Sequence, residues 1–179
     1  MESGLVINLF GGPGSGKTTT AAELFFELKK RHYDVELVTE FAKDLIMQNN
    51  PDALKHQFYV TGVQAHRIWS AAQKMQVVVV DSPIMLGPIY DQRNSKAFLD
   101  LCIEYHEELN NLNVFLGRKG VQHSMIGRVH SLTESVGLDN RIHRLLNELK
   151  IEYLSLEEMG MDKLLTLIDQ LTSSTGKWK

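Results

Sequence analysis

Short apolar runs alternate with amphipathic segments along this chain, a pattern that predicts alternating strands and helices. Asn50 is expected to cap one of the helices, with Pro51 in its first turn. The expected strands are Leu5–Phe10, Val35–Thr39, Gln76–Asp81, Asn113–Leu116 and Ile151–Leu156. The expected helices are Lys17–Arg31, Glu40–Asn49, Asn50–Gln73, Lys96–Asn111, Leu132–Leu149 and Gly160–Leu171.

This order of elements predicts an α/β fold in three layers, with helices on both faces of a mainly parallel, five-stranded sheet. The four valines Val77–Val80 support it, because the strands of a parallel sheet are buried on both faces. A ligand of such a fold binds beyond the carboxyl ends of the strands. The residues expected there are Gly11–Thr18, Glu40, Asp81–Pro83 and Arg118.

Length and charge narrow the class of protein. The 179 residues suffice for one domain, expected to span residues 1–172 and to be followed by a flexible tail at 173–179. The net charge of −3 predicts no general attraction to nucleic acid or to an acidic membrane surface. No apolar run has the length of a membrane span, and no signal-peptide pattern is found. We therefore expect a soluble, cytoplasmic protein.

The segment Gly11–Thr18 reads GGPGSGKT and fits the phosphate-binding pattern G-x-x-x-x-G-K-[ST] in full. Its glycines let backbone N–H groups curl around a phosphate, and the helix that follows directs its positive end toward that phosphate. Lys17 is expected to bridge the β- and γ-phosphates of ATP or GTP, and Thr18 to ligate Mg²⁺. The residues expected to contact the nucleotide are Gly12, Pro13, Gly14, Ser15, Gly16, Lys17, Thr18 and Thr19.

A second element of the same kind is VVVVDS, a strand that ends in an aspartate. Asp81 is expected to hold Mg²⁺, through a water molecule, unless it merely ends the strand. Ser82 stands where many ATP-hydrolysing motors carry a glutamate, and the chain has no N-K-x-D run to read guanine. The pattern favours a small kinase, which transfers phosphate to a bound acceptor and keeps water out.

Other polar residues are candidates for contacting the phosphate acceptor. Glu40 follows the second strand and is expected either to take a proton from the attacking hydroxyl, to bind a sugar, or simply to start a helix. Gln64 and Arg67 share a helical face beside aromatic residues, which fits base recognition as well as a solvated polar face. Asp81 is expected to wall the same pocket, and Tyr90 to reach it.

The segment Arg118–Arg128, RKGVQHSMIGR, is basic and follows the fourth strand. A kinase needs cations near the transferring phosphoryl group, whose charge has to be neutralised in a site without water. Arg118, Lys119 and Arg128 are the candidates, and a basic surface loop is the alternative interpretation. The residues expected to be catalytic are therefore Lys17, Glu40, Arg118 and Arg128.

Several stretches together carry a resemblance to a known family. They are GGPGSGKT, VTEFAKDL at Val38–Leu45, VQAHR at Val63–Arg67, VVVVDSPIMLGPIY at Val77–Tyr90, and Gly127-Arg128 with Asp139 downstream. Over about residues 5–156 the chain resembles the AAA-type P-loop kinases of bacteriophages. That group is similar to the nicotinamide riboside kinase domain of bacterial NAD-regulator proteins, and more distantly to nucleoside-monophosphate kinases.

The resemblance implies a sheet ordered 2-3-1-4-5, a mobile lid at about residues 118–134, and Mg²⁺-dependent phosphoryl transfer from ATP. It also implies that Glu40 and Arg67 lie on the acceptor side, and that the turn Ser155–Glu157 contacts the adenine. A phage-encoded protein would act in the cytoplasm of its host.

Three functions stay open at this point. The first is a kinase that acts on a nucleoside or a (deoxy)nucleoside monophosphate. The second is a kinase of a hydroxymethylated pyrimidine within phage DNA, for which a basic track is required; the net charge makes DNA the less favoured partner. The third is a binding module, without kinase activity, that is switched by the bound nucleotide.

Overall fold

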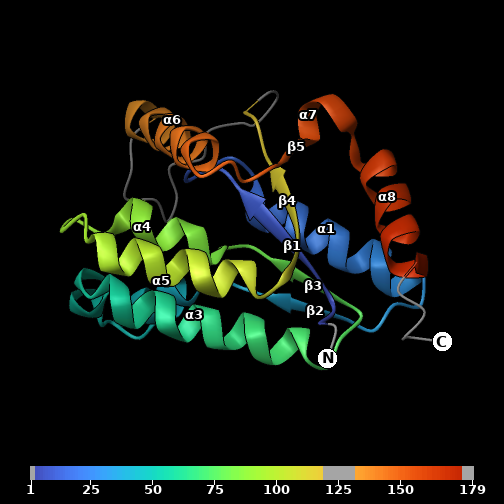
Figure 1. Ribbon diagram of the computed structural model, residues 1–179, viewed down its shortest axis with the longest axis horizontal. Helices are drawn as coiled ribbons and strands as arrows, with labels where there is room; N and C mark the ends of the chain where they lie inside the picture. The colour runs from blue at the N-terminus through green and yellow to red at the C-terminus, as the bar shows by residue number, and fades with distance from the viewer. Residues whose placement is uncertain (1–2, 119–131, 175–179) are drawn as a thin grey trace.

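A computed structural model of the chain describes residues 3–118 and 132–174, and the statements below concern these residues. They form a five-stranded parallel sheet between two layers of helices (Figure 1). The strand order is β2-β3-β1-β4-β5, which confirms the expected α/β P-loop fold. The strands are β1 (Leu5–Phe10), β2 (Val35–Val38), β3 (Val77–Val80), β4 (Asn110–Phe115) and β5 (Leu154–Ser155).

The helices alternate with these strands along the chain. The α-helices are α1 (Lys17–Lys30), α2 (Phe41–Met47), α3 (Gln57–Ala72), α4 (Gly87–Tyr90), α5 (Lys96–Glu107), α6 (Leu132–Glu148), α7 (Leu156–Met159) and α8 (Met161–Ser174). Two short 3₁₀ helices are η1 (Pro51–Lys55) and η2 (Ile84–Leu86).

The two faces of the sheet bury different sets of helices, because successive strand residues point to opposite faces. On one face Ile7 and Leu9 of β1 pack with Leu24 of α1 and Leu164 of α8. On the other face Val6 and Phe10 pack with apolar residues of α3, η2, α4, α5 and α6. Figure 1 shows α3, α4 and α5 together on one side of the strands, with α1 and α8 on the other. The residues that follow the carboxyl ends of β1 and β3 therefore lie between two layers of helices that are packed against the sheet.

Helix α2 has a small core of its own away from the sheet. Phe41 and Leu45 of α2 pack against Val60 of α3, with Leu54 and Val63 at the edge of the cluster. The Phe41 ring meets the Tyr59 ring edge to face, with centroids 5.6 Å apart. This packing sets where the beginning of α2 lies.

The single helix expected over Asn50–Gln73 is wrong in its first part. Residues Pro51–Lys55 form η1, the backbone turns out of helical geometry at His56, and α3 begins only at Gln57. The side chain of Gln57 donates to the Leu54 carbonyl oxygen at 2.8 Å, which stabilises this break. Pro51 does occupy the first turn, but the Asn50 side chain makes no capping hydrogen bond.

The helix expected over Lys96–Asn111 is too long and the strand that follows is longer than predicted. Helix α5 ends at Glu107, and β4 already begins at Asn110. The reason is a set of side-chain hydrogen bonds: Asn111 donates to the carbonyl oxygens of His106 and Leu109 and so caps the end of α5. Asn8 of β1 in turn donates to Asn111 at 2.8 Å.

The remaining differences concern short elements. The fifth strand is reduced to Leu154–Ser155, which pairs with Val114 and Phe115 of β4. The short helices η2, α4 and α7 were not expected. Most of the expected lid, at 119–131, and the last residues of the expected tail, at 175–179, lie outside the described residues.

Candidate functional site

The phosphate loop connects β1 to α1, as the sequence predicts. Gly16 has φ 92°, a backbone conformation that glycine adopts readily, and α1 begins at the next residue without a side-chain cap. The first N–H groups of a helix have no intrahelical partner, and here they point out of the loop end of α1. A Cβ atom on Gly12 would lie 2.7 Å from the Ser135 carbonyl oxygen, so only glycine fits there. The loop is thus shaped to present backbone donors to an anion.

Lys17, the lysine of the motif, folds back over its own loop. Its Nζ donates to the carbonyl oxygen of Gly11 at 2.6 Å and to that of Gly12 at 3.2 Å. Burial lowers the pKa of Lys17, an effect that the nearby carboxylates of Asp81 and Glu40 oppose. An ammonium group held in this position is poised to gain favourable contacts when phosphate oxygens approach.

The two predicted metal-site residues lie together. Thr18 is in the first turn of α1, and Asp81 directly follows β3. The Thr18 hydroxyl donates to Asp81 Oδ2 at 2.7 Å. Within the described residues Asp81 Oδ1 is buried without a hydrogen-bond partner. An unpartnered carboxylate oxygen beside a hydroxyl oxygen fits Mg²⁺, which prefers oxygen ligands and usually keeps waters and phosphate oxygens in its shell. No group of three His, Cys, Asp or Glu side chains forms a metal site of another kind in the described part of the chain.

Arg118 fastens the start of the loop to α6. Its Nε forms an ion pair with Asp139 of α6, and its Nη atoms donate to the carbonyl oxygens of Pro13, at 3.2 Å, and Ser135, at 3.1 Å. The Gly12 N–H donates to the other oxygen of Asp139 at 2.5 Å. The guanidinium group therefore has its donors directed at protein oxygens. The second expected arginine, Arg128, lies outside the described residues.

Glu40 directly precedes α2 and lies beside the metal-site pair. The link is Lys43, whose Nζ lies 3.5 Å from Glu40 Oε2 and 3.2 Å from Asp81 Oδ2. The same Nζ donates to Thr18 Oγ1 at 2.7 Å. The Glu40 side chain makes no capping hydrogen bond to α2, although its carboxylate stands at the positive end of that helix.

Gln64 of α3 is buried beneath the first turn of α2 and is not part of a solvated face. Its Oε1 accepts a hydrogen bond from the Phe41 N–H at 3.0 Å and so supports the first turn of α2. Its Nε2 is buried without a partner among the described residues. A buried amide donor with no acceptor is costly, and such groups call for a ligand or an ordered water.

Arg67 lies on the outer side of the same segment. It pairs with Asp44 of α2 at 2.8 Å, and its guanidinium lies over the Phe41 ring, 4.8 Å from the centroid. Both partners of the ion pair are more than a third exposed. Arg67 and Gln64 thus hold α2 from two sides, one at the surface and one in the interior.

Tyr90, at the end of α4, lies near enough to Glu40 and Asp139 to feel the charges of both carboxylates. Burial, followed by the charges of Glu40 and Asp139, raises its pKa to about 12, so that the phenol stays neutral and can donate. Arg141 of α6 donates to the Ile89 carbonyl oxygen at 2.5 Å and ties α4 to α6. Tyr90, a predicted acceptor residue, therefore lies at the end of α4, next to the contact between α4 and α6.

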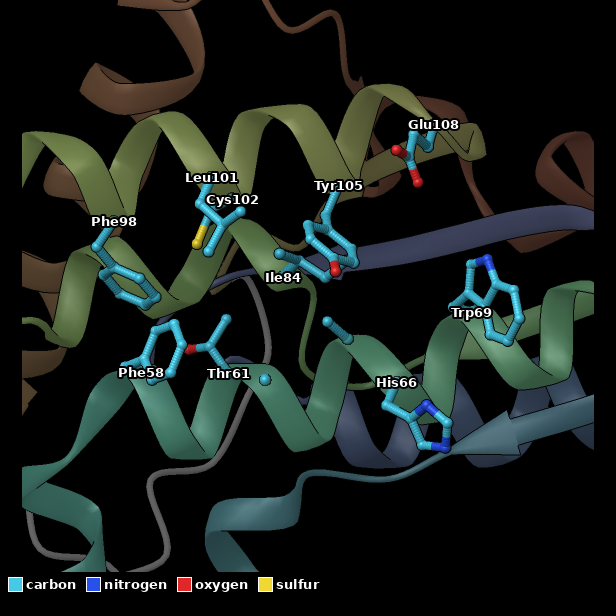
Figure 2. A pocket seen from close by; sticks show the side chains of 12 residues that line it. Phe58, Thr61, His66, Trp69, Ile84, Phe98, Leu101, Cys102, Tyr105 and Glu108 are labelled. Carbon is cyan, nitrogen blue, oxygen red and sulfur yellow. The ribbon is translucent and has the colours of Figure 1, made fainter.

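A groove of about 410 Å³ lies elsewhere, between α3 and α5. Figure 2 shows side chains of the two helices pointing toward each other across it, including Phe58 and Trp69 from α3 and Phe98 and Tyr105 from α5. None of the predicted site residues lines this groove. It is separate from the phosphate loop.

The sequence reasoning missed three residues of the site: Lys43, Asp44 and Arg141. Lys43 and Asp44 stand inside the stretch VTEFAKDL, three and four residues after Glu40. In a helix this spacing puts both residues on the side of Glu40, so this signal was available for Lys43 and Asp44. Arg141 belongs to no motif, and its role follows only from how α6 packs.

A strand, a glycine-rich loop and a helix that meet a hydroxyl–aspartate pair define a P-loop nucleotide-binding protein. The chain belongs to the AAA domain family, which it matches over residues 6–162. A P-loop domain of this kind binds a nucleotide, typically together with Mg²⁺. In the part of the chain that the structure describes, no helix is long and apolar enough to cross a membrane.

Solved structures with a similar fold include the NadR protein in complex with NR, with a TM-score of 0.62 and 16% identity. The match covers 97% of this chain but 52% of that chain, so this chain spans about half of it. A deoxyadenosine kinase from M. mycoides has a TM-score of 0.54 and 15% identity, with 94% of this chain and 99% of that chain covered. Likeness at such identities shows the fold. No curated protein matches the sequence.

Proposed function

We propose that this chain is an ATP- and Mg²⁺-dependent phosphotransferase that acts on a nucleoside or a (deoxy)nucleoside monophosphate. The observation that carries the proposal is a carboxylate, Glu40, beside the Thr18–Asp81 pair. The two carboxylates lie on either side of one ammonium group, at 3.5 Å and 3.2 Å from it. A carboxylate at this place can take the proton of an attacking hydroxyl, and Ser82, where motors carry the glutamate that activates water, favours an acceptor hydroxyl over water.

The donor side follows from the loop. The N–H groups at the start of α1 and Lys17 would bind the phosphates, and Thr18 and Asp81 would hold Mg²⁺, directly or through water. A bound Mg²⁺ would supply charge neutralisation to the transferring group. Arg118 is directed at Asp139 and at loop carbonyls, so its contribution in this proposal is to fix the loop and not to touch the phosphoryl group.

The acceptor side is formed by Glu40, Gln64 and Tyr90. In this proposal Glu40 accepts the proton of the attacking hydroxyl, because it is the carboxylate nearest the metal pair that remains one-third exposed. The unpartnered Nε2 of Gln64 and the neutral phenol of Tyr90 are donors for a base carbonyl or a sugar oxygen. Two donors and one acceptor match the hydrogen-bonding groups of a nucleoside.

Two features of the segment after β3 favour transfer to an acceptor over simple hydrolysis of ATP. Ser82 follows Asp81, so the chain has no glutamate at the place where motors activate water. The segment after it, Pro83–Gly87, is buried and forms η2 and the start of α4. The similar solved structures include one named as a deoxyadenosine kinase and one in complex with NR, which agrees with a nucleoside-type acceptor.

The test is a direct assay of transfer. The protein is incubated with ATP and Mg²⁺ and a panel of nucleosides and (deoxy)nucleoside monophosphates, and products are read by mass spectrometry. One phosphorylated product that is absent with Lys17→Ala is the expected result. Loss of ATP without any phosphorylated acceptor would overturn the proposal.

The two alternatives make different predictions in the same assay. A kinase of modified DNA would phosphorylate hydroxymethylated DNA but no free nucleoside or nucleotide. A nucleotide-switched binding module would phosphorylate nothing and would capture a partner with ATP analogue but not with ADP. The ion pair of Arg118 with Asp139 disfavours the DNA alternative, since that arginine is directed inward and not at a basic track.

A further inference from the structure

Lys43 lies in the metal pocket, although the phosphate-loop motif does not include it. Its Nζ donates to Thr18 Oγ1 at 2.7 Å and to Asp81 Oδ2 at 3.2 Å. These two side chains are the ones that fit Mg²⁺. A third oxygen, Glu40 Oε2, is 3.5 Å away, so the ammonium group is surrounded by three oxygen-bearing side chains.

The Thr18 hydroxyl has one proton and two lone pairs. Its proton is directed to Asp81, and one lone pair accepts from Lys43. A metal ion held by Thr18 and Asp81 would bind the same two side chains that the Lys43 ammonium group contacts, and two cations so close together repel each other strongly. The ammonium group in its observed position and a metal ion at Thr18 therefore exclude each other.

We infer that Lys43 is a built-in competitor of the magnesium ion: its ammonium group takes the metal position at Thr18 and Asp81, and it has to swing away before a magnesium-bound nucleotide can occupy the site. This inference rests on the proposed function, because it concerns the metal that the donor nucleotide carries.

The side chain is able to make that movement. Lys43 is on α2, whose neighbouring residues Phe41 and Leu45 are buried, while the Lys43 side chain is 50% exposed. A four-carbon stem on a fixed helix can turn toward solvent without moving the backbone. Glu40, the residue directly before α2, remains as a partner of Lys43 outside the metal pair.

The competition has a consequence for affinity. The Asp81 side chain is only 2% exposed, and a buried carboxylate needs a compensating cation. Lys43 supplies that charge when no metal does, so Mg²⁺ gains less on binding than it would beside an uncompensated carboxylate. The chain should therefore need more Mg²⁺ than the same site without Lys43.

The experiment compares how much Mg²⁺ improves ADP binding in the wild type and in Lys43→Gln, by isothermal titration calorimetry in EDTA and at stepped Mg²⁺ concentrations. The ratio of the Kd in EDTA to the Kd in saturating Mg²⁺ is expected to rise about three- to tenfold in Lys43→Gln. The Mg²⁺ concentration that gives half of this gain should fall by a similar factor.

Lys55→Gln is the matched control. Lys55 also pairs with a carboxylate three residues earlier, Asp52 at 2.6 Å, but outside the site, so its ratio should equal that of the wild type. Lys43→Met is the second variant, and far-ultraviolet circular dichroism checks that each variant is folded.

An unchanged ratio in Lys43→Gln and Lys43→Met would overturn the inference. A lower ratio would overturn it too, since Lys43 would then be a ligand of the bound phosphates. Absence of ADP binding by the wild type in every buffer would instead overturn the proposed nucleotide site, and with it the basis of the inference.

Discussion

The donor half of the site and the acceptor half are built in different ways. The donor half comprises the phosphate loop, Asp81 and the Arg118–Asp139 pair, all at the carboxyl ends of strands or on the helices that pack there. The proposed acceptor half comprises Glu40, Gln64, Arg67 and Tyr90, which lie at the start of α2, on α3 and at the end of α4.

This difference shows in which contacts hold the polar side chains. In the donor half the side chains bond to each other and to the loop backbone, although Asp81 Oδ1 and Ser15 Oγ are buried without a partner in the described residues. In the proposed acceptor half Gln64 Nε2 is likewise unpartnered there, and Arg67 is held by an exposed ion pair. The donor half is fixed by the sheet and the loop, while the proposed acceptor half depends on how α2 and α4 pack outside the sheet.

The largest effect is expected at Lys17. Lys17→Met should lower kcat/KM for the transfer reaction about 10³-fold or more, because the ammonium group acts on charge that develops at the phosphates. The free energy of unfolding should stay the same or rise by about 1 kcal/mol, since a buried charge is removed. Urea unfolding followed by circular dichroism measures the second quantity. A loss of stability in this variant would mean that Lys17 mainly holds the loop together.

The next effect tests whether Arg118 positions the loop or touches the phosphoryl group. Arg118→Met leaves the Asp139 carboxylate buried without its partner, so the free energy of unfolding should fall by about 2–3 kcal/mol. Nucleotide affinity should fall about tenfold, because the loop loses the hydrogen bonds of Arg118 to the Pro13 carbonyl oxygen. Both quantities are measured on the same preparation, by urea unfolding and by calorimetry.

The double variant Arg118→Met/Asp139→Asn separates the two roles. If Arg118 acts through the ion pair, the second substitution should restore part of the lost stability, giving a coupling energy of about 1–3 kcal/mol. An activity loss in Arg118→Met with unchanged stability would instead mark Arg118 as a catalytic cation.

A smaller effect is expected in the acceptor half at Gln64. Gln64→Leu removes the unpartnered Nε2 donor together with the oxygen that accepts from the Phe41 N–H. The KM for the acceptor should rise about tenfold, while the KM for ATP should change less than twofold. Steady-state kinetics with each substrate varied in turn gives both values.

Gln64→Glu is the control, because it keeps an oxygen for the Phe41 N–H but removes the amide donor. An acceptor KM that rises in both variants identifies the donor as the important group. A rise in Gln64→Leu alone would mean that Gln64 acts only by supporting the first turn of α2.

The sequence was sufficient for the sheet and for the phosphate loop, because both follow from local patterns. Four consecutive valines and the eight residues of GGPGSGKT each specify an element without reference to the rest of the chain. The closeness of the phosphate loop and Asp81 could be predicted too, because parallel strands have their carboxyl ends at the same edge of the sheet. The Thr18–Asp81 contact confirms that reasoning for the donor half.

The parts that sequence did not reveal depend on contacts between distant segments. Asn111 reads as helical until Asn8 is placed beside it in the neighbouring strand. From the sequence Gln64 fits a base-binding residue as well as a solvated one, and only the packing of α2 shows that it is buried. Lys43 contacts Glu40 nearby in sequence, but its contacts with Thr18 and Asp81 come from distant segments. Such contacts leave no periodic signal, and short elements such as η2 and α4 are fixed by the same long-range packing.

The smallest effect is expected at Arg67, and it tests what kind of acceptor the second half takes. The ion pair of Arg67 with Asp44 is exposed, so Arg67→Gln and Asp44→Asn should each change the free energy of unfolding by less than about 1 kcal/mol. The two variants break the same pair and serve as controls for each other. If the acceptor carries a phosphate that Arg67 binds, only Arg67→Gln should raise the acceptor KM, about threefold to tenfold, and only for monophosphates. Equal kinetics in the two variants would limit Arg67 to holding α2, and the acceptor would then be recognised by Gln64 and Tyr90 through its base or sugar.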